Sequence, residues 1–212
     1  MTEKVPKGRR ERKKREMKER ILKAAEKLFA HEGFDKTTIA AIAEVADVGV
    51  GTAYNYYSSK DILLIAALKA RLLETAPDLF QNPGPPARDR VRYLMEPALG
   101  FMGLVGLYSK ELWFQFMAAI YGAGHTLDSP VFELDWMLME NTRKRVVILQ
   151  QAGFIRPDVD SEQAAMVLFA SVFMRFQMYV MEPEMNVDTL KNLLIQDAEL
   201  VLAGIQKQEG RD

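Results

Sequence analysis

The segment from Thr37 to Leu63 constrains the fold of this chain more than any other stretch. It reads TTIAAIAEVADVGVGTAYNYYSSKDIL. Two short apolar patterns with helical spacing flank Ala46 and Asp47, and Thr37 or Thr38 can cap the first of them. Small residues at the crossing let two helix backbones meet closely. The segment therefore predicts two short helices packed across a tight turn.

The rest of the chain also shows helical periodicity, interrupted by glycine, proline and capping residues. Gly33 is predicted to end a first helix that starts near Met17, Ser59 to cap the fourth helix and Asp160 the eighth. Residues 82–86 (NPGPP) read as a linker. The expected helices are 17–32, 39–45, 49–56, 60–76, 87–105, 110–121, 131–152, 161–181 and 187–206. The prediction is an all-α chain of about nine helices, with a small domain at 1–60 before a larger one at 61–212.

The amino-acid composition excludes some classes of protein function and favours others. Apolar residues make up 49% of the chain, which can therefore build a sizeable core, and no cysteine is present, which excludes disulfides and cysteine-based zinc sites. No uncharged apolar run reaches 18 residues, so no membrane span is expected. Residues 1–20 hold ten Lys/Arg and four Asp/Glu, whereas the whole chain has a net charge of −1. A basic end on an acidic protein indicates a polyanionic partner.

The third helix of the segment is expected to expose side chains that read the major groove of double-stranded DNA. Threonine can contact a base or a thymine methyl group, asparagine can bond adenine, and tyrosine hydroxyls suit phosphates. The helix N-termini at Thr38 and Ser59 present backbone N–H groups to phosphates, and Lys60 adds a charge. The outward candidates on the third helix are Val50, Gly51, Thr52, Asn55 and Tyr56.

These residues resemble the signature of the TetR family of bacterial ligand-responsive transcriptional regulators. The matching positions are Ile21-Leu22, Ala24-Ala25, Leu28-Phe29, Gly33-Phe34, Thr37-Thr38, Ile42-Ala43, Val48, Gly51-Thr52, Tyr54, Tyr57, Ser59-Lys60-Asp61 and Leu63. The resemblance implies a nine-helix subunit, a two-fold dimer through the last two helices and an effector pocket in the C-terminal domain. It also implies DNA contacts by Thr38, Thr52, Tyr54, Tyr56 and Lys60, with Tyr57 as a packing residue.

Two positions depart from that signature. Ala40 stands where relatives often place a polar base reader on the second helix, and Gly49 replaces the usual serine-type cap of the third. Base reading is therefore expected to fall mainly on Thr52 and its neighbours.

Most aromatic and methionine side chains of the chain lie between residues 93 and 185. Such side chains fill cores, and they also line adaptable apolar cavities. With the resemblance, they predict a pocket for a small, mostly apolar effector. Its expected lining is Phe101, Met102, Trp113, Phe114, Met117, Tyr121, Trp136, Met137, Phe169, Phe173 and Phe176.

The eighth predicted helix is apolar on more than one side, so one side can face a second subunit. Together with the ninth helix it would form a four-helix interface between two copies. Arg175 lies within this apolar helix and is expected to pair with an acid such as Asp197, or to meet an anionic head group. The expected interface residues are Ala164, Leu168, Ser171, Leu190, Leu194, Val201 and Ile205.

Two other functions would each fit part of the sequence. An enzyme is disfavoured because the Tyr56-x-x-x-Lys60 spacing lacks a glycine-rich nucleotide loop, and the two histidines lie near no nucleophile or metal-ligand cluster. A membrane-surface or non-specific nucleic-acid binder would explain the basic end but not the third helix. The sequence thus predicts a cytoplasmic, homodimeric repressor without a metal or cofactor, which a small apolar effector releases from operator DNA.

Overall fold

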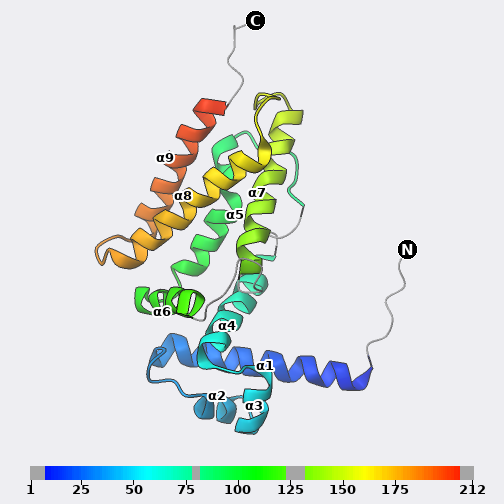
Figure 1. The fold of residues 1–212 in the computed structure, drawn as a ribbon, viewed down its shortest axis with the longest axis vertical. Coiled ribbons are helices and arrows are strands. Elements are labelled where there is room, and N and C mark those ends of the chain that lie inside the picture. Colours follow the sequence, from blue (N-terminus) through cyan, green and yellow to red (C-terminus); the bar gives the residue numbers. More distant parts are fainter. Residues whose placement is uncertain (1–7, 78–81, 123–131, 206–212) are drawn as a thin grey trace, which may run out of the picture. The chain divides into compact units, whose positions relative to one another are not determined.

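A computed structural model describes residues 8–77, 82–122 and 132–205 (Figure 1). These residues form nine α-helices and contain no β-strand. The all-α prediction is therefore confirmed. In chain order the helices are α1 (Arg9–Glu32), α2 (Ile39–Val45), α3 (Val50–Tyr56), α4 (Lys60–Thr75), α5 (Arg90–Val105), α6 (Lys110–Gly122), α7 (Glu133–Gln151), α8 (Ser161–Met181) and α9 (Val187–Ile205).

With one exception, the expected helix ends within the described residues agree with the observed ones to within three residues, and the expected ends at Val131 and Gln206 lie outside the described residues. Helix α1 begins at Arg9 rather than near Met17. Residues 9–16 hold only Arg, Lys and Glu, which are good helix formers, so the helix continues past the apolar pattern used to place its start. The pattern marks where the helix is buried rather than where it begins.

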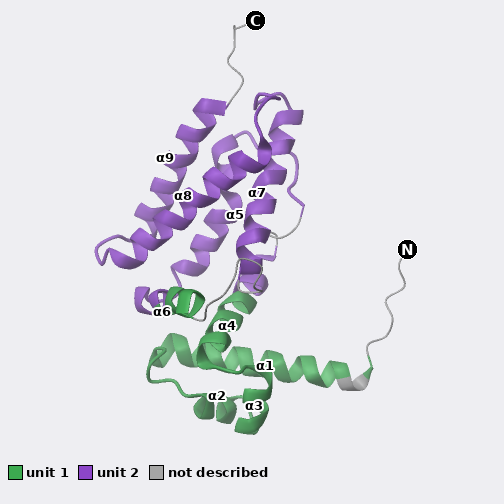
Figure 2. Ribbon diagram, viewed as in Figure 1, with its two compact units in different colours: residues 1–71, 115–123 green, residues 72–114, 124–212 purple. Residues whose placement is uncertain are grey.

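The chain divides into two compact units (Figure 2). Unit 1 comprises residues 1–71 and 115–123, and unit 2 comprises residues 72–114 and 124–212. Helices α4 and α6 each contribute residues to both units.

Unit 1 has a small apolar core whose members come from α1, α2 and α4. Ile21, Phe29, Ile42, Leu63 and Leu64 are among its fully buried side chains. They pack one face of each helix inward and leave the charged faces in solvent, as expected for amphipathic helices.

The loop between α1 and α2 is held by three local features. Gly33 ends α1 with φ = 84°, a conformation that favours glycine. The Thr37 hydroxyl donates to the Gly33 carbonyl over 2.8 Å and is buried. The exposed Thr38 therefore serves as the N-cap of α2, where its hydroxyl accepts from the Ala41 N–H over 3.1 Å.

In unit 2, α8 packs against α7 and α9, and α5 packs against α7 and α9 (Figure 1). Helix α9 buries a stripe at Leu190, Leu194, Ala198 and Leu202, which recur every four residues. Asp160 caps α8 by accepting from the N–H groups of Glu162 and Gln163, which confirms the predicted cap.

Helix α5 contains Pro97 in its interior. Proline has no N–H, so the carbonyl four residues earlier, that of Tyr93, lacks its helical donor. The buried guanidinium of Arg145 on α7 supplies the missing hydrogen bond, with Nη1 donating to the Tyr93 carbonyl over 2.8 Å. Asn141 and Glu96 hold this guanidinium at 2.9 Å and 2.5 Å. A side chain from a neighbouring helix thus completes the proline-interrupted helix.

By length and composition, α8 is the one described helix that is apolar enough to cross a membrane. Helices in the core of soluble proteins can have the same length and apolar composition. Part of α8 is buried inside unit 2, and its Arg175 forms a bidentate ion pair with Asp197 of α9 at 2.8 Å. The predicted Arg175–Asp197 pairing is confirmed. Helix α8 packs on α7 and α9 within unit 2.

Candidate nucleic-acid interface and apolar cavity

The turn between α2 and α3 is closed by backbone hydrogen bonds and small side chains. The Val48 N–H donates to the Ala43 carbonyl over 2.9 Å. Ala43 and Ala53 are buried together with Ile39, and Val48 packs against this cluster. The predicted roles of the small residue Ala43 and of the wedge Val48 are confirmed, so α3 is held firmly on α2.

Arg20 of α1 stabilises the same turn through hydrogen bonds to its residues. Its Nε donates to the Ala46 carbonyl over 2.9 Å, and its Nη2 bonds the Ala46 and Asp47 carbonyls and, at 3.2 Å, the Asp47 carboxylate. Asp47 has φ = 51°, a left-handed conformation that aspartate tolerates better than most residues. Sequence reasoning missed this contact, because 26 residues separate Arg20 from the carbonyl that it binds and nothing in the basic N-terminus distinguishes Arg20 from its neighbours.

Helix α3 presents its predicted reading face to solvent. Val50, Gly51, Tyr54 and Asn55 are exposed, and Thr52 is half-buried. Ala53 points the other way, into the core. A seven-residue helix with one anchored side chain and an open outer face has the form of a recognition helix. Which of these side chains contact bases stays a prediction.

Two tyrosines at the end of α3 have different roles. Tyr57 is buried, as predicted, and burial raises the pKa of its hydroxyl, with a smaller contribution from Tyr56. Tyr56 is half-buried, and the ammonium of Lys18 lies 5.9 Å from its ring centroid. Tyr56 therefore stays available as a phosphate contact, whereas Tyr57 is a core residue.

Lys60 has a structural role in addition to the predicted one. Its Nζ donates to the Phe34 carbonyl over 2.9 Å and lies 4.1 Å from the centroid of the Phe34 ring. An ammonium has three donors, so this anchoring leaves others for a phosphate. Ser59 beside it caps α4, as predicted, by accepting from the Ile62 N–H over 3.2 Å. The phosphate contacts of Thr38 and Lys60 stay predictions.

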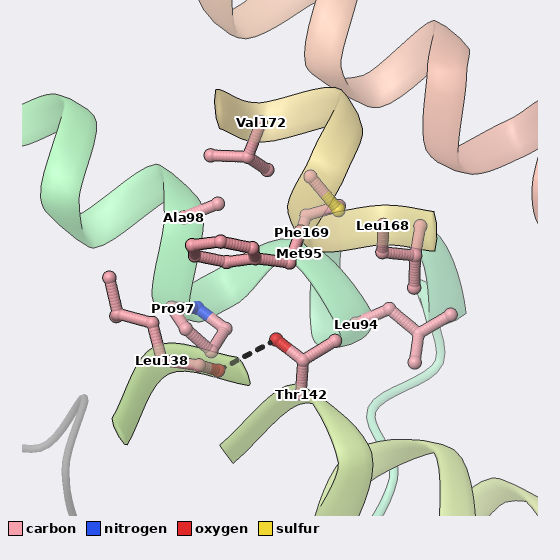
Figure 3. A pocket seen from close by; sticks show the side chains of 9 residues that line it. All are labelled: Leu94, Met95, Pro97, Ala98, Leu138, Thr142, Leu168, Phe169 and Val172. Atoms are coloured by element: carbon pink, nitrogen blue, oxygen red, sulfur yellow. Dashed lines mark hydrogen bonds between the residues drawn. The ribbon is translucent and has the colours of Figure 1, made fainter. Parts of the chain in front are cut away.

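Unit 2 contains a small apolar cavity between α5, α7 and α8 (Figure 3). Its volume is about 20 Å³, room for about one water molecule. One hydroxyl, that of Thr142, lies among the lining side chains and donates to the Leu138 carbonyl over 3.0 Å. The lining residues are Leu94, Met95, Pro97, Ala98, Leu138, Thr142, Leu168, Phe169 and Val172.

Of the residues expected to line an effector pocket, Phe169 alone lines this cavity. Phe101, Trp113 and Phe176 form an edge-to-face cluster instead, with ring centroids 5.5 to 5.8 Å apart, and the Trp113 indole donates to the Val105 carbonyl over 3.0 Å. Met102 is also fully buried. Phe114, Tyr121, Trp136 and Phe173 are exposed, while Met117 and Met137 are half-buried. Aromatic content alone thus does not separate cavity walls from packed core.

The residues expected at a dimer interface differ in their exposure within the single chain. Ala164, Leu168, Leu190 and Leu194 are buried inside the single chain, and Leu168 also lines the cavity. Apolar periodicity predicted these residues, and it marks the inward face of a helix as readily as the outward one. Val201 and Ile205 are half-buried, and Ser171 donates to Asp197 over 2.5 Å. The apolar residues that α8 exposes are Met166, Val167, Phe173, Met174, Met178 and Met181.

Asp135 is the described acid with the largest upward pKa shift. Burial near the start of α7 raises its pKa to about 6. Among the described residues no cluster of His, Cys, Asp or Glu has the geometry to hold a metal ion.

The packing of α3 on α2 across a tight turn, with the outer side of α3 exposed, defines the class of this fold as a helix-turn-helix protein. The model of the family "Bacterial regulatory proteins, tetR family" matches residues 21–67. The transcriptional repressor KstR of Rhodococcus jostii is 33% identical over 115 residues, which are 54% of this chain and 54% of KstR. This chain therefore spans about half the length of that relative. Residues 21–67 are thus similar to the TetR family, and the matched relatives are transcriptional regulators rather than enzymes.

Solved structures share the whole fold. A putative TetR-family regulator from Rhodococcus sp. has a TM-score of 0.63 at 22% identity, covering 89% of this chain and 99% of that one. The regulator FadR of Bacillus subtilis, solved in complex with stearoyl-CoA, has a TM-score of 0.64 at 19% identity, covering 88% of this chain and 98% of FadR. At these identities the likeness is one of fold.

Proposed function

We propose that this chain is a homodimeric transcriptional repressor whose α3 reads operator DNA and which a mostly apolar small molecule releases. The observation that carries the proposal is α3 itself. Val50, Tyr54 and Asn55 on its outer side are exposed and Thr52 is half-buried, while Arg20, Val48 and the buried Ala53 fix its orientation. Operator DNA of a bacterial regulator lies in the cytoplasm, which is therefore the proposed location.

The test of DNA reading starts from duplexes selected from a random library by the full chain. Thr52→Ala should weaken binding to the selected operator by about 1–3 kcal/mol and relax the preference at one base position. Binding to random duplex should change little, because phosphate contacts supply that affinity. Thermal unfolding of the variant serves as the folding control. Equal operator affinity of Thr52→Ala and wild type, together with an unchanged base preference, would refute base reading by Thr52.

The exposed apolar face of α8 supports the homodimer. Its residues 166, 167, 173, 174, 178 and 181 recur at intervals of three, four and seven, which is typical of a seam between paired helices. On α9, Leu200 is 77% exposed, and Ala203 and Gly204 beside it are exposed small residues that allow close approach. Two copies joined through these faces would present two α3 helices to matching sides of the duplex, about 34 Å apart.

A charge on this face should separate the subunits. Met174→Glu is expected to shift the sedimentation coefficient from dimer to monomer and to abolish operator binding. Leu107→Glu is the matched control, because Leu107 is 60% exposed in unit 2 but lies outside α8 and α9. A Met174→Glu protein that sediments as wild type would overturn the proposed interface.

The cavity between α5, α7 and α8 is the proposed start of the effector site. Its walls are apolar apart from Thr142, which suits a mostly apolar ligand with one hydrogen-bonding group. A ligand of drug size needs several hundred Å³, so these helices must separate on binding. FadR, which has a similar fold, was solved in complex with stearoyl-CoA, which supports the proposal of a ligand with an apolar chain.

Effector binding can be measured with the fluorescent probe 8-anilinonaphthalene-1-sulfonate. Val172→Phe should fill the cavity and weaken probe binding, whereas Phe169→Ala should enlarge it and strengthen binding. Once a ligand is found, it should lower operator affinity by about 1–3 kcal/mol of coupling. A saturating ligand that leaves operator affinity unchanged would rule out release as the mechanism.

A further inference from the structure

The N-terminal part of α1 is a helix without a core to pack on. We define the basic arm as residues 9–19, which hold seven Lys/Arg and three Glu. Side chains 11–16 are all exposed, and the first buried residue of α1 is Ile21. Figure 1 shows this part of α1 running out beyond α2 and α3. Burial of apolar side chains therefore does not account for the helical structure of the basic arm.

The charges of the arm do not stabilise it as a free helix either. Its N-cap is Gly8, which makes no side-chain capping bond, and its first turn carries Arg9, Arg10 and Arg12 against one acid, Glu11. Cations at a helix N-terminus oppose the helix dipole.

Ion pairs within the arm compensate little for these charges. Arg12–Glu16 at 3.5 Å and Arg15–Glu19 at 3.7 Å are each more than half exposed, so solvent screens them. Both also place the base before the acid, which is the weaker order on a helix. The net charge of +4 is therefore uncompensated within the arm.

The arm lies beside the proposed recognition helix. The ammonium of Lys18 is 5.9 Å from the ring centroid of Tyr56, the last residue of α3. Lys14 lies one turn earlier on the same face of α1, since residues four apart are neighbours on a helix. From Lys18 back to Arg9 the helix rises about 13 Å, which equals about four base pairs of duplex.

We propose that the basic arm is a second DNA-contacting surface, which follows the phosphate backbone next to the site that α3 reads. The proposal rests on the proposed DNA-binding function and adds a sequence-independent contact to it. A polyanion along the face of Lys14 and Lys18 supplies the negative charge that the arm lacks. The bound duplex would also strengthen the helix, because phosphates offset the cations of its first turns.

Salt dependence of binding tests this contact. Affinity is measured between 50 and 200 mM salt for the selected operator and for a random duplex of the same length. Lys14→Gln should reduce the slope of log K against log salt by about 0.9 on both duplexes, the value of one phosphate contact. Gln matches Lys in helix propensity, so the helix itself is preserved.

Lys27→Gln is the matched control. Lys27 is exposed on α1 and lies half a turn around the helix from Lys18, so its removal should leave both slopes unchanged. A Lys14→Gln slope equal to that of wild type on both duplexes would overturn the arm contact while leaving operator reading intact. Normal slopes without any preference for the selected operator would instead overturn base reading and keep the arm. A wild-type chain that binds neither duplex would overturn both.

Discussion

The hydrogen bond from Arg145 to the proline-interrupted helix α5 makes a quantitative prediction. Arg145→Met keeps much of the aliphatic length but removes the guanidinium. The Tyr93 carbonyl and the Asn141 side chain then each lose a buried donor, at about 1–3 kcal/mol each. Glu96 is 60% exposed, so the loss of its ion pair adds little. The expected total is a loss of about 3 kcal/mol in the free energy of unfolding.

Pro97 provides the internal control for this reasoning. Pro97→Ala restores a backbone N–H at position 97, which can donate to the Tyr93 carbonyl in the ordinary helical manner. In that background Arg145→Met removes the donor of one group fewer and should cost about 2 kcal/mol. The expected coupling between the two substitutions is therefore about 1 kcal/mol, the net value of one hydrogen bond.

The measurement is urea unfolding of the four proteins at one protein concentration, because the proposed dimerisation would make apparent stability depend on concentration. Far-ultraviolet circular dichroism reports helix content in each variant. If Arg145→Met costs the same with and without Pro97, to within about 0.5 kcal/mol, Arg145 does not replace the missing helical bond.

Two further predictions concern the helix-turn-helix and the half-buried acid Asp135. Arg20→Met should lower the free energy of opening the α2–α3 turn by about 1–2 kcal/mol, because a half-exposed side chain loses its charge-assisted bonds to two carbonyls. Hydrogen exchange at the Val48 amide should then rise about 5- to 30-fold. An unchanged exchange rate would contradict the proposed role of Arg20 in stabilising the turn. Asp135 binds its proton more tightly in the folded state, with a pKa of about 6 against 3.8, so it should lower stability as pH rises from about 4 to 6. Asp135→Asn should remove that trend, and identical urea midpoints of variant and wild type at pH 4.5 and pH 7 would show that the shift is absent.

The sequence by itself determined the helices and the helix-turn-helix motif. Local chemistry decides where a helix stops, as at Gly33, and where it starts, as at Thr38, Ser59 and Asp160. These capping signals act within four residues, so they can be recognised in the sequence without knowledge of the tertiary structure. The close packing of α3 on α2 also follows locally, from small residues at their crossing.

Tertiary structure alone decided which apolar residues face which way. Leu168 and Phe173 belong to the same apolar helix, yet the first is buried beside the cavity and the second is exposed. Periodicity reveals that a helix has apolar faces but not which neighbour covers each one. The partners of Arg20 and Arg145 were hidden for the same reason, because they lie 26 to 52 residues away and one positive charge in a sequence looks like another.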